Sequence, residues 1–224
     1  MTPGLDTTPR RLVDIVVAVV LLLALAPLFV VVALAVRLDS AGPILYRAPR
    51  VGRAHQPFRM LKFRSMHADA DQLGAGVSGQ DDARVTRVGR ILRTTKVDEL
   101  PQLLNVVQGT MTLVGPRAES PQYVAHYRPH ESLLLNVRPG VTGPGQIAFT
   151  KWQAAELDGV EDPDRYYVEH QLHDKLALDL DYLAKRSLRR DVGIVASTLA
   201  LVASAAGRAL AGRSAAVDAA QLLT

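Results

Sequence analysis

The chain has no cysteine among its 224 residues, so it contains neither a disulfide bond nor a metal site built from thiolates. This absence is compatible with the reducing cytosol but does not require it. The length suits one domain of ordinary size with a small appendage.

Aromatic side chains are scarce as well, at 5% of the chain with a single tryptophan. Proteins that bind single-stranded nucleic acid stack bases on aromatic side chains set among basic ones. Such aromatics are missing around the arginines of this chain, so we expect no nucleic-acid partner. The formal net charge of +4 instead suits an anionic membrane surface or a phosphate-bearing substrate.

Acidic residues are nearly missing between residues 10 and 64, where only Asp14 and Asp39 oppose many basic side chains. Positive charge flanks the cytoplasmic ends of membrane segments, and here it lies on both sides of an apolar run. The basic residues are Arg10, Arg11, Arg37, Arg47, Arg50, Arg53, Arg59, Lys62 and Arg64.

That apolar run, residues 15–36, has no charge over 22 residues, which is long enough to cross a bilayer as one straight helix. Pro27 interrupts it, and proline inside a helix predicts a kink or break near Ala26. Each half is then about 18 Å long or less, which is too short to cross. From these residues alone, a re-entrant hairpin and a kinked span are equally favoured, since membrane helices tolerate proline.

The remaining sequence predicts an α+β fold that is mainly helical. Two extended stretches near 44–48 and 58–65 form a short β-hairpin, and residues 69–83 form a glycine-rich loop. Residues 84–108 are helical in two parts, divided near Gly89 and Thr94–Thr95, and Gly109 ends the second part. Residues 163–186 form an amphipathic helix. The expected divisions are 1–38 for the tail and membrane segment, 39–202 for a small cytoplasmic catalytic domain, and 203–224 for an Ala-rich tail.

The stretch "KVDELPQLLN", residues 96–105, places Asp98 and Glu99 side by side, two positions before Pro101. Proline is accepted in the first turn of a helix, so a helix begins close to Asp98, with Thr95 or Asp98 as its cap. Acids are favourable there because of the helix dipole, and capping alone explains them.

Basic side chains near this pair suggest chemistry instead. Arg93 precedes it, Arg117 follows in the next turn, and Lys62 and Arg64 lie on the second extended stretch. A carboxylate among such charges should stay ionised well below neutral pH, which suits a nucleophile better than a general acid. Attack on a diphosphate then needs arginines and a divalent cation to offset the repulsion between anions, and Mg²⁺ suits Asp98 and Glu99 as oxygen ligands.

Four segments in order resemble the bacterial sugar transferases, the monotopic polyprenyl-phosphate phosphoglycosyl transferases. They are "RRLVDIVVAVVLLLALAPL", "RLDSAGPILYRAPRVGRAHQPFRMLKFRSM", "TRVGRILRTTKVDELPQLLNVVQGTMTLVGPR" and "VRPGVTGPGQ". The resemblance covers about residues 10 to 202. It implies transfer of a phospho-sugar from a UDP-sugar to a polyprenyl phosphate, commonly undecaprenyl phosphate, with release of UMP. It also implies Mg²⁺ dependence, a ping-pong route through a phospho-sugar on aspartate, and a re-entrant helix in the inner membrane of a bacterium, with the catalytic domain in the cytoplasm.

The resemblance assigns roles by position. Asp98 matches the nucleophile, Glu99 its metal-associated partner, and Arg93 and Arg117 the phosphate-contacting arginines. Lys62 matches a basic residue of the Lys-Phe-Arg motif that also includes Arg64, and Pro27 matches the helix breaker, which favours the re-entrant form. The chain departs from the family pattern in three places: Ala118 follows Arg117 where proline is usual, Pro144-Gly145 replaces a bulky residue and alanine, and Ala26 stands where serine is common.

The sequence thus predicts an enzyme that begins the assembly of an exopolysaccharide, capsule, O-antigen or glycoprotein glycan. Two alternatives stay open: a phosphohydrolase that uses the same acids with water as acceptor, and a non-catalytic membrane scaffold in which Asp98 and Glu99 only cap a helix. The residues identify neither the sugar nor the exact lipid, and they leave open whether the chain forms homo-oligomers.

Overall fold

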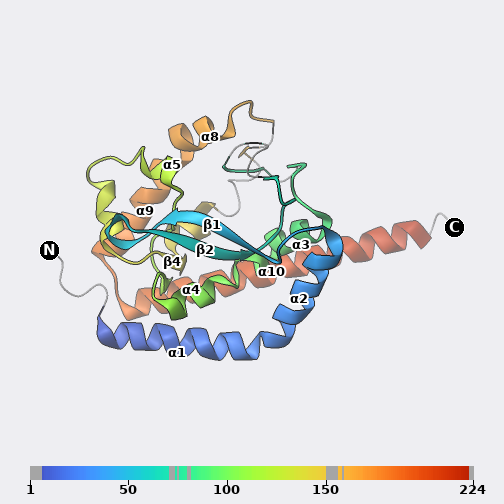
Figure 1. Cartoon of the computed structure of the whole chain (residues 1–224), viewed down its shortest axis with the longest axis horizontal. Helices are drawn as coiled ribbons and strands as arrows, with labels where there is room; N and C mark the ends of the chain where they lie inside the picture. Colours follow the sequence, from blue (N-terminus) through green and yellow to red (C-terminus); the bar gives the residue numbers. More distant parts are fainter. Residues whose placement is uncertain are drawn as a thin grey trace.

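The computed structural model describes residues 7–70, 74, 76–79, 82–149, 156, 157 and 159–221, with side chains of the last helix described through residue 207. Helices dominate, and the strands are few and short (Figure 1), as predicted. The helices are α1 (Thr8–Ala24), α2 (Ala26–Asp39), α3 (Arg87–Thr95), α4 (Gln102–Gln108), α5 (Pro121–Val124), α6 (Pro144–Phe149), α8 (Pro163–Tyr166), α9 (His173–Ala184) and α10 (Leu188–Gln221). The strands are β1 (Leu45–Val51), β2 (Pro57–Phe63), β3 (Thr112–Val114) and β4 (Gly140–Thr142).

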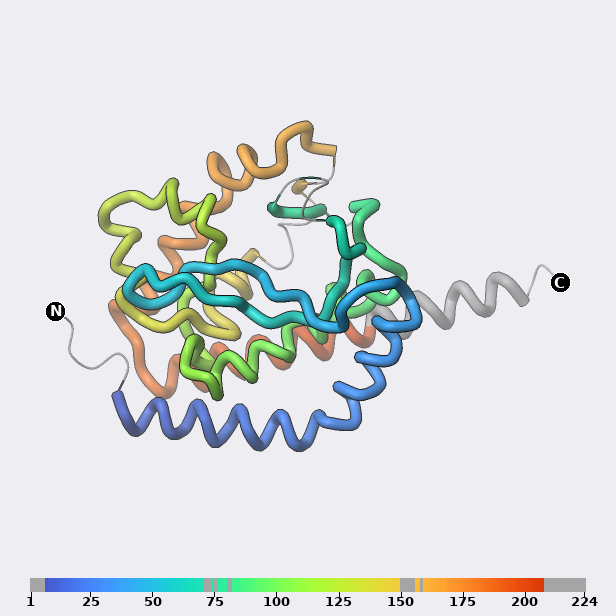
Figure 2. The backbone as a smooth tube through the Cα atoms, viewed as in Figure 1, coloured from blue at the N-terminus to red at the C-terminus, as the bar shows by residue number. Residues whose placement is uncertain are grey.

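Strands β1 and β2 form the predicted hairpin, antiparallel and in register from Leu45 opposite Phe63 to Val51 opposite Pro57. The tube in Figure 2 shows the two strands side by side across the middle of the molecule. A second pair, β3 and β4, is parallel, and the sequence analysis did not predict it. Strands of three residues are too short for a periodic pattern to indicate them.

Three groups of buried apolar side chains hold these elements together. The first lies between α1, the hairpin and α4, and includes Ala18, Met60 and Val106. The second joins α5 to the helical stretch that ends with α9, and the third joins α2 to β2 and α3. Figure 1 shows α1 below α4, with the hairpin above. The hairpin and α4 therefore share one core with the start of the chain.

The apolar run breaks as predicted. Helix α1 ends at Ala24, α2 begins at Ala26 with Pro27 in its first turn, and the two axes differ by 64°. Leu25 lies between them with φ −92° and ψ 2°, one residue before the expected break. The bend follows from proline, whose missing N–H and bulky ring disrupt the preceding turn.

Helix α10 is a feature that the sequence analysis missed. It runs on from Leu188 through residue 202, so the expected boundary between catalytic domain and tail falls inside one helix. Within the described residues, its Leu188–Gly207 part is long and apolar enough to cross a membrane, and the bent pair α1 and α2 also qualifies if it is counted as one span. Of the residues in this part, Ala205 is buried and the others are exposed or half-buried.

The region 84–108 divides into two helices as expected, but not at Gly89. The first helix, α3, continues through Gly89 and ends at Thr95. Gly89 is required for packing instead, since a Cβ atom there would lie 1.9 Å from the carbonyl oxygen of Ser65. Gly109 ends α4 with φ +94°, as predicted.

The predicted amphipathic helix 163–186 is present as one helical stretch with a wider middle. It consists of α8, the π-helix η5 (Tyr167–Leu172) and α9. Leu172 and Leu176 are buried among the side chains of the second core. A π-helix inside an α-helix often marks a functional segment, and this one turns Tyr167 into the protein interior.

Candidate active site

The turn that carries Asp98 and Glu99 differs from the predicted helix start. Lys96 adopts a left-handed conformation with φ +59° and ends α3, and a single 3₁₀ turn, η3 (Val97–Glu99), follows. Leu100 and Pro101 keep helical backbone angles and lead into α4. The left-handed residue therefore reverses the chain and presents both acids directly before α4.

Neither expected capping residue caps the helix. The Thr95 hydroxyl donates to the carbonyl oxygen of Ile91 within α3, and neither η3 nor α4 has a side-chain cap. The expectation of a cap at Thr95 or Asp98 is therefore wrong. Because the 3₁₀ turn continues almost directly into α4, the first N–H groups of α4 find backbone carbonyl oxygens, as Leu103 N–H does at Leu100.

Asp98 is buried, with 6% of its surface exposed, and its Oδ1 atom has no hydrogen-bond partner among the described residues. Burial raises the pKa of Asp98, and the nearby charge of Lys62 offsets only part of that rise. Burial therefore outweighs the surrounding cations in its effect on this pKa. A buried carboxylate oxygen without a partner is costly, which indicates that a bound molecule or ion satisfies it.

Glu99 forms ion pairs with two of the basic side chains that the sequence predicted near Asp98 and Glu99. Lys62 Nζ lies 2.8 Å from Glu99 Oε1, and Arg117 Nη2 lies 3.5 Å from the same oxygen. Burial raises the pKa of Glu99, but the charges of Lys62 and Arg117 together outweigh it and hold that pKa well below its usual value. The structure thus brings together Lys62, Asp98, Glu99 and Arg117 from β2, η3 and the turn after β3.

Arg93 lies at the edge of this group. It comes from the last turn of α3, and its guanidinium donates to the hydroxyl of Ser78. Its charge lowers the pKa of Asp98 less than the charges of Lys62 and Lys96 do. Arg93 therefore acts on Asp98 through its charge, more weakly than Lys62 does.

Arg64 does not join the group, and its predicted contact with phosphate does not fit its position. Its side chain is buried and donates to backbone carbonyl oxygens of Val36, Ser40 and Ala41 at the end of α2, with the Nη2 to Ser40 oxygen distance 2.7 Å. Cations stabilise the carbonyl end of a helix in this way. Alternation along a strand would place Lys62 and Arg64 on the same face, but β2 ends at Phe63, so Arg64 lies beyond the strand and does not follow that pattern.

A second buried polar cluster lies beyond Arg117, and the sequence analysis did not find it. The Tyr167 hydroxyl donates to Glu119 Oε1 at 2.8 Å, and Lys175 Nζ lies 2.7 Å from the Tyr167 oxygen and 3.5 Å from Glu119. Burial raises the pKa of Glu119, but Lys175 and Arg117 reverse the direction and lower it. Lys175 stands in an ordinary amphipathic pattern, so its burial had no signal in the sequence.

Carboxylate chemistry allows a magnesium ion at this site. Among the described residues, no group of three or more His, Cys, Asp or Glu side chains could hold a metal. Mg²⁺ is commonly held by one or two carboxylates together with waters and substrate phosphates, and Asp98 with its unpartnered Oδ1 fits that requirement. Glu99 fits less well alone, because Lys62 and Arg117 already occupy one of its oxygens.

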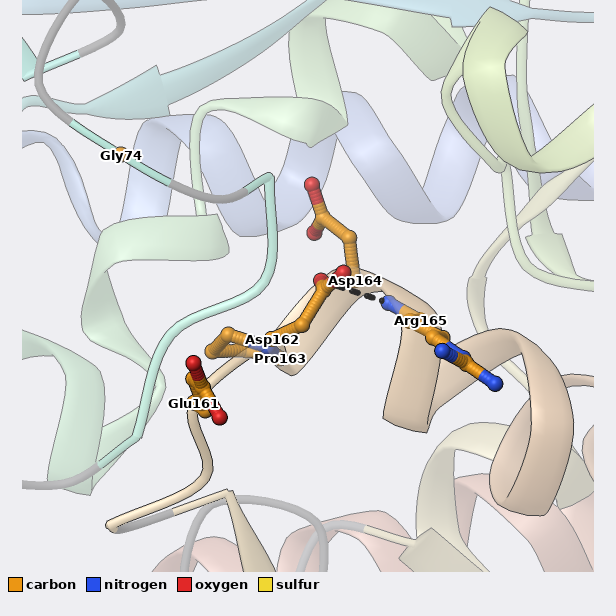
Figure 3. A pocket seen from close by; sticks show the side chains of 6 residues that line it. All are labelled: Gly74, Glu161, Asp162, Pro163, Asp164 and Arg165. Atoms are coloured by element: carbon orange, nitrogen blue, oxygen red, sulfur yellow. Dashed lines mark hydrogen bonds between the residues drawn. The ribbon is translucent and has the colours of Figure 1, made fainter.

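An open hollow of about 720 Å³ lies between Gly74 and the start of α8, and it does not contain the predicted residues. Figure 3 shows Glu161, Asp162 and Asp164 around it, with the side chain of Arg165 extending away. A wall of carboxylates disfavours a diphosphate, so we do not assign the substrate to this hollow.

Comparison with known proteins identifies the family. The model of the bacterial sugar transferase family matches residues 5–205. The UDP-glucose:undecaprenyl-phosphate glucose-1-phosphate transferase of Caulobacter vibrioides is 39% identical over 193 residues, which cover 85% of this chain and 68% of that protein. The undecaprenyl-phosphate glucose phosphotransferase of Komagataeibacter xylinus is 38% identical over 209 residues, 87% of this chain and 36% of that protein.

A relative of similar size is the exopolysaccharide production protein PSS of Rhizobium leguminosarum bv. phaseoli, 36% identical over 203 residues that cover 87% of this chain and 95% of that protein. The match spans only about a third to two thirds of the two named transferases above. The range of this chain that the family model matches includes the acidic pair and the basic side chains around it. The chain belongs to the bacterial sugar transferase family.

Proposed function

We propose that this chain transfers a phospho-sugar from a UDP-sugar to a polyprenyl phosphate, with undecaprenyl phosphate as the acceptor, and releases UMP. Family membership and the names of the relatives from Caulobacter vibrioides and Komagataeibacter xylinus support this reaction. The name of the Rhizobium relative supports a place in exopolysaccharide production.

The observation that carries the proposal is the buried, unpartnered Oδ1 of Asp98 next to a Glu99 that is already paired with cations. One carboxylate is thus free to react, while its neighbour holds Lys62 and Arg117 in place. A cap or a plain surface acid would find a backbone N–H or water. This difference favours an enzyme over the scaffold alternative.

In the first half-reaction, an ionised oxygen of Asp98 attacks the sugar-bearing phosphorus of the UDP-sugar. A bond forms between this oxygen and phosphorus, the bond from phosphorus to the UMP oxygen breaks, and UMP leaves with that electron pair. Arg117 and Lys62 both contact Glu99, the residue next to Asp98, so we expect them to meet the phosphate oxygens of the donor. Their positive charges would stabilise the negative charge that develops on these oxygens in the transition state.

In the second half-reaction, a phosphate oxygen of the polyprenyl phosphate attacks the same phosphorus. The bond from Asp98 to phosphorus breaks, the carboxylate is restored, and the product is a polyprenyl diphosphate sugar. The two steps make a ping-pong route in which positioning and charge neutralisation lower most of the barrier.

We propose Mg²⁺ as the cofactor, held by Asp98 and Glu99. It would neutralise charge between the two phosphates of the donor. Arg93, at the edge of the site, would meet the more distant phosphate.

We also propose that the chain lies in the cytoplasmic face of a bacterial inner membrane, with α1 and α2 as a re-entrant hairpin. The uncharged part of each helix is too short to cross alone, and positive charge at both ends of the pair, with a bend of 64° between the helices, suits a segment that enters and leaves on one side. Many large apolar side chains of this pair face outward, which suits lipid. They are Leu12, Val13, Val16, Val17, Val19, Val20, Leu21, Leu23, Leu28, Val30, Val31, Leu34 and Leu38.

The reaction is tested with purified protein, Mg²⁺, undecaprenyl phosphate and a panel of UDP-sugars that includes UDP-glucose, with UMP as the readout. We expect UMP and lipid-linked sugar from wild type and at least about a 1,000-fold loss with Asp98→Asn at an unchanged melting temperature. Asp181→Asn, a change of the same kind at an exposed position, is the control.

Other outcomes of this assay identify the alternatives. Free sugar phosphate in the absence of lipid would mean a phosphohydrolase, and absence of UMP with every donor would mean a scaffold. Full turnover by Asp98→Asn would refute the assigned nucleophile.

Topology is tested with single cysteines, because the native chain has none. Cysteines at Thr8 and Ser40, at the two ends of the bent pair, are labelled with an impermeant thiol reagent in intact cells and in inverted vesicles. We expect both to react only in inverted vesicles. Labelling from opposite sides would mean a true span.

A further inference from the structure

Asp179, on α9, joins two turns that come from distant parts of the chain. Its Oδ2 accepts a hydrogen bond from the backbone N–H of Arg117 at 3.1 Å, and its Oδ1 accepts one from the backbone N–H of Gly145 at 3.0 Å. The side chain is 2% exposed, so water does not compete for either bond. Both bonds are charge-assisted when the carboxylate is ionised, and such bonds are stronger than neutral ones.

The strands β3 and β4 connect the same two turns from the other side. Gly115 N–H donates to the carbonyl oxygen of Thr142 at 3.0 Å, and Gly140 N–H donates to that of Pro116 at 2.8 Å. The turn before Arg117 is thus fixed to β4, and the turn after β4 is fixed to Asp179. Asp179 closes a ring of hydrogen bonds around the backbone of Arg117.

The ring leaves little space for movement. A Cβ atom on Gly143 would lie 2.2 Å from the carbonyl oxygen of Gly115, and one on Gly145 would lie 2.9 Å from that of Lys175. Both distances are shorter than real contacts of a Cβ atom, so these backbones touch because neither residue has a side chain.

Arg117 needs an external support of this kind. Its guanidinium must keep its 3.5 Å contact with Glu99 while 24% of the side chain stays exposed for a substrate. The residue after it is Ala118, which restricts the backbone less than proline would. Pro116 restricts the backbone before Arg117, so on the other side of Arg117 rigidity depends on hydrogen bonds rather than on a proline ring.

We infer that Asp179 is a positioning residue, which holds the Arg117 backbone so that its guanidinium meets the donor diphosphate. The inference rests on the proposed function, and it adds a residue that touches no substrate and lies 62 positions from Arg117 along the chain. Displacement of a charged group by about 1 Å can lower a rate about 100-fold, so the loss of one anchor should be measurable.

The test compares Asp179→Asn with Asp181→Asn, in wild type and in an Arg117→Ala background. Asp181 is the matched control, because it lies two residues away on α9 and, within the described part of the chain, its carboxylate pairs with the exposed Lys185 and Arg190. Steady-state kcat/KM for the UDP-sugar, calorimetric affinity for UDP and melting temperature are measured for each variant. We expect Asp179→Asn to lower kcat/KM and affinity for UDP about 10- to 100-fold in wild type, and Asp181→Asn to change neither.

The double variant separates positioning from general damage. If Asp179 acts through Arg117, Asp179→Asn causes no further loss in the Arg117→Ala protein. Equal losses in the two backgrounds, or unchanged kcat/KM in Asp179→Asn, would overturn the inference. A wild type without turnover would instead contradict the proposed function, and the UDP affinities would still report on Asp179.

Gly145→Ala is a second variant in case Asp179→Asn does not fold. It keeps every charge, but its Cβ would lie 3.1 Å from Asp179 Oδ1 and would displace the carboxylate. We expect the same loss of affinity for UDP, again absent in the Arg117→Ala background. Undiminished affinity in Gly145→Ala would contradict the positioning role.

Discussion

Lys62 Nζ lies 2.8 Å from Oε1 of Glu99, and this ion pair joins strand β2 to the turn that carries Asp98. Each side chain is only 16% exposed. Two opposite charges so poorly solvated depend on each other, since either alone would remain as an uncompensated charge in the interior. The pair therefore supports both the fold and the orientation of the neighbouring carboxylate.

This dependence predicts the stability of three variants. Glu99→Gln should lower the free energy of unfolding by about 3 kcal/mol, because it leaves Lys62 buried without its partner. Lys62→Met should lower it by less, because Glu99 keeps Arg117 at 3.5 Å. The double variant should lose less than the sum of the two, which thermal unfolding in detergent measures. A loss equal to the sum would show that the two charges do not interact.

Arg64 should behave as a structural residue. Arg64→Met removes the donors to the carbonyl oxygens at the end of α2, so we expect a lower melting temperature. The KM for the UDP-sugar should stay within about twofold of wild type. Arg117→Met is the comparison, and for it we expect a raised KM for the UDP-sugar at a nearly unchanged melting temperature. A large rise in KM for Arg64→Met at unchanged stability would restore its predicted contact with phosphate.

Gly89→Ala tests the contact between α3 and the segment after β2. Alanine favours a helix over glycine by about 1 kcal/mol, but its Cβ would collide with the carbonyl oxygen of Ser65. We expect a net destabilisation of about 2 kcal/mol. Gly193→Ala on α10 is the control, since its Cβ would meet nothing within 4 Å, and it should be neutral or stabilising. Equal effects of both changes would contradict the packing described.

Asp179 should make stability depend on pH. Burial raises its pKa to about 6 from an ordinary 3.8, so folding favours its protonated form. The stability that this group contributes is full below about pH 4 and is lost as pH rises through about 6. The melting temperature of wild type minus that of Asp179→Asn should therefore fall between pH 4 and pH 7. A difference that rises with pH would mean that the two backbone hydrogen bonds lower the pKa more than burial raises it.

Much of the fold follows from local sequence signals. Pro27 predicts the break, because the missing N–H acts on the adjacent turn, and Gly109 ends α4 through its left-handed conformation. The hairpin follows from its apolar stretches and the turn between them. These features depend on residues close together in the chain, which a reading of the sequence can compare directly.

Features that depend on distant residues could not be predicted in this way. Lys175 and Glu119 are buried together although 56 positions separate them, and nothing near either residue indicates it. The burial of Asp98, which raises its pKa, also depends on the whole fold. Helix α10 escaped notice because alanines and charged residues dilute its apolar pattern.

The covalent step on Asp98 is tested most directly by the mass of the intact protein after incubation with UDP-sugar and Mg²⁺ but without lipid acceptor. We expect a mass increase equal to one phospho-sugar, located on Asp98 by peptide mapping and discharged when undecaprenyl phosphate is added. Formation of lipid-linked sugar by a protein that never shows this adduct would contradict the proposed route.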